Sequence, residues 1–470
     1  MLFINILFFY SFISLILCSN ERKLIFVYSH FTSGASAPSL NNENNKDIFG
    51  TEWMNPGELT NIGERMHYIL GMYNKERYIK NNTLLNANFD PHEIYIVTFD
   101  WNRTVESVLA QINGMFPLGT GKEIEDYQKK YAVPPVKSNN MSLELQDNIS
   151  SLNNTNFTLP QQQNIIPIHF HSSIDCSSTM DKFIEKNKKE DNQIKNILKD
   201  MKEKYDEKLK NYFDDIKSQY DFSFEGYEDI CGPLIFNIIN VRDLSNLEAN
   251  YSINLKEFFQ DCKNFLNISL FNKDFGDKER KFLNFHTSHY IKNILHYAQN
   301  AINQDKIGKL TNNYNNPKML LFSGHDGTLG SLELKLKDTF HFEKLIYPLF
   351  ASSLNIELYK KNNLKKNDLI DSDYEIEIYF DGEYLVTVQY DEFKKKLLKN
   401  VLNENEIESF CNLKPYLDRK KIKKFKNLSV TFIVFTIILI IIVIILIGII
   451  IYTKKINNDK STFSKLLNEN

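Results

Sequence analysis

Four short apolar runs, separated by stretches with helical spacing, constrain the fold of this chain more than any other feature. Each run has the length and composition of a buried strand, and they lie at 23–28, 93–99, 165–170 and 318–322. Between them, apolar residues recur at helical spacing, as at 59–78 and 104–116. Strands that alternate with helices in this way predict an α/β fold with a mostly parallel sheet flanked by helices.

A helical insert and a second group of strands complete this pattern. The residues from 181 to 220 are Lys-rich and helical, and with the stretch that follows they predict an inserted α-helical cap at about 176–303. The core then comprises 20–175 and 304–412. Asp381 and Gly382 predict a hairpin turn within a final group of strands, expected at 353–359, 374–380 and 384–388.

Both ends of the chain are apolar. Residues 2–18 form a nearly unbroken apolar run, which predicts a signal peptide at 1–19, with an uncleaved anchor as the alternative. Residues 431–452 are apolar throughout and, at ~1.5 Å per residue, long enough to cross a ~30 Å hydrocarbon core. The predicted organisation is an ectodomain at 20–425, one C-terminal transmembrane helix at 430–452 and a cytoplasmic tail at 453–470.

The charges that flank the segment at 430–452 oppose this orientation. Six basic residues lie between 419 and 426, whereas only Lys454 and Lys455 follow the segment closely, which is the reverse of the positive-inside rule. A translocated domain can override that bias, so we expect a single-pass type I membrane protein of the secretory pathway, at the cell surface or in a lysosome-like compartment. The 56 basic and 59 acidic side chains leave no basic field for a nucleic-acid partner.

Sequons and cysteines agree with passage through an oxidising compartment. Eight N-x-S/T triplets lie between 81 and 269, and several fall in an Asn-, Ser- and Gln-rich stretch at 137–163 that predicts a mobile glycosylated loop. Apart from Cys18, the cysteines are Cys176, Cys231, Cys262 and Cys411. Four cysteines allow two disulfides with three connectivities, and four buried free thiols are the alternative.

Polar side chains follow three of the predicted strands. His30 comes after the first strand, Arg103 lies between the second strand and a helix, and the pair His325–Asp326 follows the strand at 318–322. The carboxyl ends of parallel strands meet at one edge of a sheet, so these residues are candidates for a common site. A capping or packing role for each is the alternative. The histidines have no metal-ligand spacing, so neither a metal nor a cofactor is expected.

At these residues the chain resembles the histidine acid phosphatases, the second branch of the histidine phosphatase superfamily. The resemblance runs from about 23 to 411, and the segments that carry it are 57–78, 100–117, 165–169, 322–330 and 347–361. It implies an α/β sandwich with an inserted α-helical cap, disulfides Cys176–Cys411 and Cys231–Cys262, and by analogy a homodimer.

The resemblance also implies a reaction, the hydrolysis of a phosphomonoester substrate or the binding of a phosphate-like ligand. His30 would attack phosphorus and form a phosphohistidine. Asp326 would protonate the leaving group, while Arg103 and His325 would hold the phosphoryl oxygens. Water would then hydrolyse the phosphohistidine.

The chain departs from the family around the nucleophile, where the pattern R-H-G-x-R reads Ser29, His30, Phe31, Thr32, Ser33. Loss of one preorganised donor costs ~10² to 10³ in turnover, so loss of both arginines could cost on the order of 10⁴. Phe31 would add bulk where glycine lets the backbone approach phosphate. Three hypotheses follow: residual phosphatase activity, a catalytically dead pseudophosphatase that binds a ligand, and a structural or adhesive surface glycoprotein.

Overall fold

The computed structural model describes residues 22–40, 45–133, 141–171, 192–217, 226–270, 277–307, 316–343, 347–361, 369–399, 401–403 and 405–407. The chain forms two compact units, Met1–Leu402 and Asn403–Asn470, and the elements below belong to the first. The predicted signal peptide, transmembrane helix and tail, together with Cys176 and Cys411, lie outside the described residues. Within these ranges, no helix combines the length and the apolar character needed to span a membrane.

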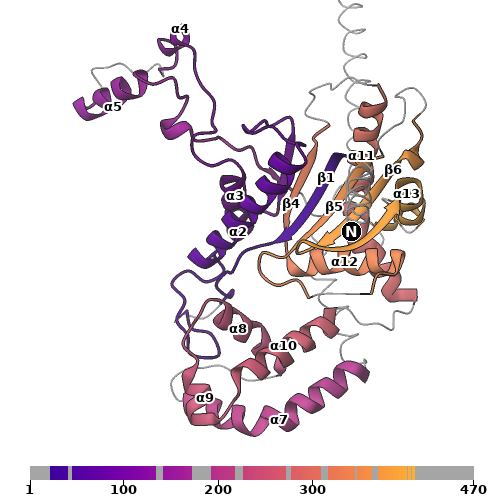
Figure 1. Cartoon of the computed structure of the whole chain (residues 1–470). Helices are drawn as coiled ribbons and strands as arrows, with labels where there is room; N and C mark the ends of the chain where they lie inside the picture. The colour runs from indigo at the N-terminus through magenta and orange to yellow at the C-terminus, as the bar shows by residue number, and fades with distance from the viewer. Residues whose placement is uncertain are drawn as a thin grey trace, which may run out of the picture. The chain divides into compact units, whose positions relative to one another are not determined.

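One seven-stranded sheet forms the centre of the first unit, in the spatial order β3-β2-β4-β1-β5-β6-β7 (Figure 1). Its strands are β1 (Lys23–Thr32), β2 (Ile94–Thr98), β3 (His169–Phe170), β4 (Met319–Gly324), β5 (Ser353–Lys360), β6 (Tyr374–Phe380) and β7 (Glu383–Gln389). The strands from β3 to β1 pair in parallel, and the pairs from β1 to β7 are antiparallel. Since β6 therefore runs with β1, only β5 and β7 oppose the other strands, and the predicted α/β fold is confirmed.

The predicted apolar runs form strands because each is covered on both faces. β4 is buried along its whole length between β1 and β2. The run at 165–170 is an exception, because only its last two residues pair, at the free edge of β2. The hairpin turn is formed by Asp381 and Gly382, whose positive φ angles of 49° and 81° suit a two-residue connection between β6 and β7.

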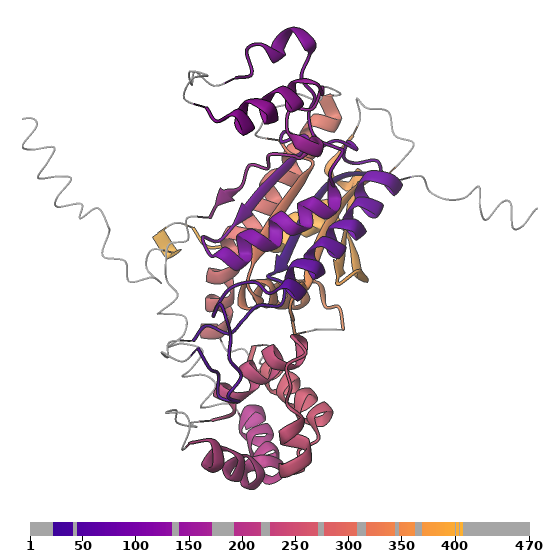
Figure 2. The ribbon, with the colours of Figure 1, turned by 90° about the vertical axis from the view of Figure 1, so that its left-hand side faces the viewer.

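Helices cover both faces of the sheet (Figures 1 and 2). One layer contains α2 (Asn61–Asn74) and α3 (Asn102–Met115), and the other contains α11 (Asp277–Ile307), α12 (Asp326–Phe340) and α13 (Tyr390–Leu398). α2 begins at Thr60, whose side chain accepts a hydrogen bond from the amide of Gly63. The layers differ in packing, because α2 turns Gly63, His67, Gly71 and Asn74 inward rather than large apolar side chains.

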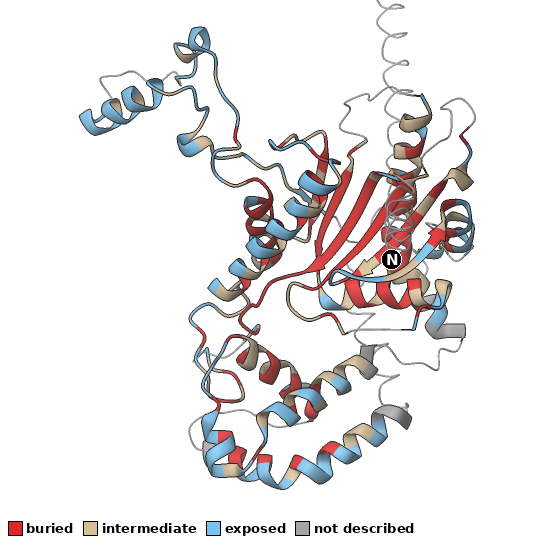
Figure 3. Ribbon diagram, viewed as in Figure 1, coloured by how far each residue is buried: buried red, intermediate tan, exposed pale blue. Residues whose placement is uncertain are grey.

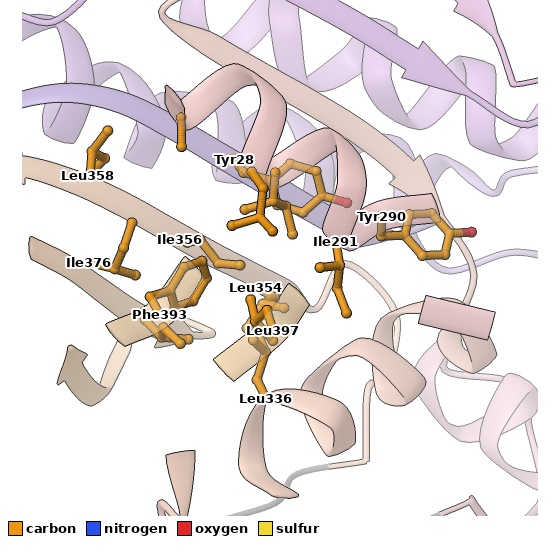
Figure 4. Close-up of a cluster of buried hydrophobic side chains, with 14 of the residues drawn as sticks. Tyr28, Tyr290, Ile291, Leu336, Leu354, Ile356, Leu358, Ile376, Phe393 and Leu397 are labelled. Carbon is orange, nitrogen blue, oxygen red and sulfur yellow. The ribbon is translucent and has the colours of Figure 1, made fainter. Parts of the chain in front are cut away.

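The larger hydrophobic core lies between the sheet and the α11–α13 layer. Figure 4 shows part of it, with Leu354 and Ile356 of β5, Ile291 of α11 and Phe393 of α13. Figure 3 shows the central strands buried and the outer helix faces exposed. A second core lies on the α3 side and includes Val27 and other side chains of β1, β2 and β4. Both cores fix β1 and β4, the strands that carry His30 and precede His325.

A group of four helices forms its own core. These are α7 (Asn192–Lys217), α8 (Tyr227–Ile239), α9 (Ser245–Tyr251) and α10 (Leu255–Leu270). A disulfide joins Cys231 of α8 to Cys262 of α10, and both residues are buried. α11, which the predicted cap includes up to about 303, packs on the sheet instead. The domain boundaries stay a prediction.

The predicted loop at 137–163 contains a helix, so that expectation is wrong for part of its length. α5 (Leu143–Asn153) begins at Ser142, whose hydroxyl accepts a hydrogen bond of 3.2 Å from the amide of Leu145. None of its residues is buried, so its start is fixed by the cap and not by packing. The remaining short elements are η1 (Lys75–Asn81), α4 (Asp126–Lys129), η3 (Pro160–Gln162) and η5 (Asp371–Asp373).

Candidate active site

The sequence-predicted residues lie at the carboxyl edge of the parallel strands. His30 pairs in register with Phe322 of β4, which also pairs with Val97 of β2. Arg103 is the second residue of α3, which follows β2, and His325 is the N-cap of α12, which follows β4. The geometry of an open α/β sheet thus brings the three strand ends together.

His30 is completely buried, and its two ring nitrogens both have partners. Nδ1 lies 3.1 Å from the hydroxyl of Tyr28, and Nε2 lies 3.2 Å from the hydroxyl of Thr328. The rings of Phe322 and Tyr290 lie 4.7 and 5.2 Å from the His30 ring, centroid to centroid. Burial lowers the pKa of His30 to about 3, and electrostatic interactions with His325 and His171 add to this effect. The imidazole is therefore neutral at physiological pH.

Thr328 determines which nitrogen of His30 carries the proton. We assign the one proton of the Thr328 hydroxyl to the carbonyl oxygen of His325 at 2.8 Å, and with this assignment the hydroxyl accepts from His30 Nε2–H. Nδ1 then accepts from the hydroxyl of Tyr28, whose pKa burial raises. Neither nitrogen has a free lone pair in this arrangement.

Arg103 is partly buried and faces an aromatic ring. Its Nη1 donates to the carbonyl oxygen of Gly57 at 3.2 Å, and its guanidinium carbon lies 4.3 Å from the centre of the Trp101 ring. Desolvation lowers the pKa of Arg103, while the carboxylates of Asp326 and Glu58 act in the opposite direction. A partly desolvated cation of this kind attracts an anion strongly.

His325 lies between two aromatic rings. Phe99 is stacked on it at 4.8 Å with an interplanar angle of 17°, and Trp101 lies at 4.1 Å. Burial and the charge of Arg103 lower the pKa of His325 to about 4. The ring is therefore a neutral donor, held in one orientation.

Asp326 is exposed at the start of α12. One carboxylate oxygen accepts from the hydroxyl of Tyr347 at 2.9 Å, and the other accepts from the amide of Gly327 at 2.9 Å. Burial and Asp326 raise the pKa of Tyr347, so the phenol stays protonated and donates. Tyr347 thus fixes the carboxylate proposed as general acid.

The three substituted positions have different environments. Ser29 is buried, and its hydroxyl has no hydrogen-bond partner among the residues that the structure describes. Phe31 packs in the core on the α3 side with its ring 5.2 Å from that of His67, and it therefore lies on the opposite face of the sheet from the ring of His30. The reason is strand geometry, because adjacent residues of β1 point to opposite faces. Ser33 is buried, and its carbonyl accepts from the amide of Ala351 at 2.9 Å.

Two further histidines lie at this edge. His171 directly follows β3, and its ring lies 4.3 Å from that of His289 in α11. The sequence offered one signal for His171, since it follows a predicted strand as His30 does, but His289 lies inside a helix and had none. Among the described residues, no group of acidic, histidine or cysteine side chains could hold a metal ion.

Comparison with known proteins identifies relatives for most of the chain. A model of the histidine phosphatase superfamily (branch 2) matches residues 14–380. Human testicular acid phosphatase is 34% identical over 100 residues, which are 21% of this chain and 23% of that protein. Human prostatic acid phosphatase is 36% identical over 61 residues, 13% of this chain and 15% of that protein. These aligned stretches therefore span less than a quarter of either relative.

Solved structures of similar proteins include two phytases. A phytase from Hafnia alvei in complex with tartrate has a TM-score of 0.49 and 12% identity, with 83% of this chain and 98% of that chain covered. A phytase from Citrobacter braakii has a TM-score of 0.48 and 12% identity, with 82% and 99% covered.

Proposed function

The chain belongs to the histidine phosphatase superfamily, branch 2, and from this premise we propose that it binds phosphate monoesters at the carboxyl edge of the sheet while hydrolysing them very slowly or not at all. A phosphatase of this family needs a nucleophilic imidazole and cations around the phosphoryl group. The chain retains the histidine, His30, but lacks the two arginines that flank it in the family pattern.

One observation carries the proposal: His30 is buried, with Nδ1 3.1 Å from the hydroxyl of Tyr28 and Nε2 3.2 Å from that of Thr328, which we assign as a proton on Nε2. Attack on phosphorus needs a nitrogen lone pair aimed at the substrate. Here one nitrogen is protonated, and the other accepts from Tyr28. Catalysis would require His30 to change its tautomer and lose a hydrogen bond before it could react.

The loss of positive charge supports the same conclusion. Ser29 and Ser33 are buried where the family pattern has arginines, so they offer at most hydroxyl groups. A charge-assisted, bidentate contact to phosphate is stronger than a hydroxyl contact and stabilises the charge of the transition state. Arg103 is then the one permanent cation among the predicted site residues, and with His325 it supplies binding.

Slow hydrolysis through His30 is the second candidate. The observation in its favour is that His30, Arg103, His325 and Asp326 meet at one edge of the sheet. In that reaction the His30 nitrogen forms a bond to phosphorus as the ester P–O bond breaks, and Asp326 gives its proton to the leaving oxygen. Water then cleaves the P–N bond and releases phosphate, so no oxidant or other reactant is needed.

We further propose that this protein is a glycosylated ectoprotein held in a membrane by the helix at 430–452. The sequons, the paired cysteines and the apolar segments support this location. One relative, from Xenopus laevis, is named a lysosomal acid phosphatase, which agrees with the secretory pathway. A homodimer stays a proposal by family analogy.

Hydrolysis of an aryl phosphate by the full-length protein in detergent tests both candidates. Wild type, His30→Ala and the double variant Ser29→Arg/Ser33→Arg are compared from acid to neutral pH. Equal inactivity of wild type and His30→Ala supports the binding function. Turnover that His30→Ala abolishes establishes the slow phosphatase instead. Phosphatase activity that appears in the double variant shows that the missing arginines account for the lack of activity in wild type.

A further inference from the structure

We propose that His171 and His289 are additional ligands of the phosphoryl group, and that binding of the ligand takes up protons, so that it strengthens as the pH falls. This inference rests on the proposed function, because it concerns the same edge of the sheet. In place of the two permanently charged arginines of the family pattern, the site would then use His171 and His289, whose charge depends on pH.

His171 is held at the site by the main chain. Its amide donates to the carbonyl oxygen of Thr98 at 2.8 Å, which places it beside the carboxyl end of β2. Its ring lies 5.6 Å from that of Phe99, which stacks on His325, and 5.6 Å from that of Phe322, which contacts His30. His171 therefore shares its aromatic neighbours with both predicted site histidines.

The ring nitrogens of His171 are buried, and apart from a contact with its own main chain neither has a hydrogen-bond partner in the described part of the chain. Buried polar atoms in folded proteins nearly always have hydrogen-bond partners, because a buried polar atom without one destabilises the fold. Two such atoms in one ring, at an edge where a ligand is expected, are suited to a partner that the described residues do not supply. An oxyanion satisfies this requirement because it accepts hydrogen bonds from several directions.

His289 extends the pair toward the solvent. The side chain is exposed, and its ring is almost perpendicular to that of His171, at 89°. Its Nε2 accepts from the side-chain amide of Asn293 at 3.0 Å, so the neutral ring has its proton on Nδ1. That N–H is a donor with no protein acceptor among the contacts of this ring.

The charges that face the pair explain why protons are taken up. The groups that interact with it are His30 on β1, and Tyr290 and Lys292 on α11. Desolvation lowers the pKa of both His171 and His289, and for His289 the nearby His171 and Lys292 add to the effect. A dianion near these rings favours their charged forms, and by linkage each bound proton then favours the anion.

Isothermal titration with sulfate tests the proposal on the full-length protein in detergent. Sulfate has the shape of phosphate and stays a dianion from pH 5.5 to 7.5, so any pH dependence comes from the protein. In wild type we expect the affinity for sulfate to rise at least tenfold as the pH falls from 7.5 to 5.5. Each proton taken up contributes up to about tenfold per pH unit. Titration in two buffers of different ionisation enthalpy counts those protons directly.

Three variants separate the possible outcomes. His171→Gln/His289→Gln keeps N–H donors but cannot be charged, so it should bind sulfate with a pH dependence of about twofold or less. His296→Gln is the matched control, because His296 lies on the same helix, is exposed and makes the same type of contact, to Asn300 at 3.1 Å. It should behave as wild type. Arg103→Gln should weaken binding at every pH.

The same data show which proposal fails. Sulfate binding that depends on Arg103 but has an unchanged pH dependence in the double histidine variant overturns the role of His171 and His289 and leaves the proposed function standing. Absence of sulfate binding by wild type at every pH overturns both. If the double histidine variant unfolds, proton counting in wild type decides the question instead. Uptake of less than about 0.3 protons per bound sulfate then contradicts the inference.

Discussion

The hydroxyl of Thr328 lies 3.2 Å from Nε2 of His30, the ring nitrogen that we propose to be protonated. Thr328 belongs to the first turn of α12, where its hydroxyl also accepts from the amide of His325 at 3.0 Å. The same side chain therefore caps the helix and fixes the tautomer of His30. A substitution of Thr328 therefore affects both the first turn of α12 and the hydrogen bond to His30.

The first prediction concerns this tautomer. We expect His30 to stay neutral, with its proton on Nε2, from pH 7 to about pH 4, because burial lowers its pKa to about 3. Long-range ¹H–¹⁵N correlation spectra of ring-labelled protein distinguish the two tautomers and the charged form. Assignment by the His30→Ala variant identifies the signal. A proton on Nδ1, or a titration near pH 6.5, contradicts the proposed tautomer.

The second prediction concerns Ser29. Its buried hydroxyl has no partner, so Ser29→Ala should change the free energy of unfolding by less than about 0.5 kcal/mol or raise it. Ser323→Ala is the matched control, because that hydroxyl is also buried but donates to the carbonyl oxygen of Thr104 at 2.8 Å. The control should lose about 1 kcal/mol in urea unfolding. Equal losses in both variants would show that Ser29 has an unrecognised partner.

The third prediction concerns the contact between α2 and α3. A Cβ on Gly71 would overlap the carbonyl oxygen of Gln111, which is main chain and cannot move aside, so Gly71→Ala should destabilise the protein by about 3 kcal/mol or more. Gly327 lies in the first turn of α12 with open space around its Cα, and Gly327→Ala should be neutral or stabilising by up to about 1 kcal/mol. Thermal unfolding compares the two variants. A mild effect of Gly71→Ala would mean that the two helices are not in such close contact.

Much of the fold could be predicted because it depends on local pattern. Apolar runs and turn residues gave β1, β2, β4 and the hairpin at 381–382, and strand order along the chain brought His30, Arg103 and His325 to one edge. These features need only periodicity and the rule that parallel strands end together.

The remainder depends on contacts between distant residues. The direction of Phe31 follows from which residue of β1 faces which layer, and the tautomer that we propose for His30 depends on a threonine 298 positions away. Nothing in the sequence around His289 distinguishes it from other helical residues, because its position beside His171 results from the packing of α11 on the sheet. Neither periodicity nor spacing encodes such pairs, because they arise only when the layers assemble.

The last prediction is that acid destabilises this protein through its buried histidines. His30, His67 and His286 have pKa values lowered to about 3, 4 and 4, in each case mainly by burial. An unfolded histidine takes up a proton below about pH 6.5, whereas these folded ones do so only near pH 3–4. Their contribution to stability is therefore complete above pH 6.5 and is lost as the pH falls toward 4.

His67 gives the sharpest test of this effect. Its ring is fully buried, with Nε2 3.0 Å from the carbonyl oxygen of Thr32 and Nδ1 3.2 Å from the side chain of Gln111. Between pH 7 and pH 5 this one histidine should account for about 2 kcal/mol of lost stability, at a slope of at most ~1.4 kcal/mol per pH unit. His67→Gln lowers stability at pH 7 but should remove that part of the pH dependence, whereas the exposed His296→Gln should keep it. Urea unfolding at both pH values measures the difference, and an unchanged slope in His67→Gln would show that other groups cause the acid sensitivity.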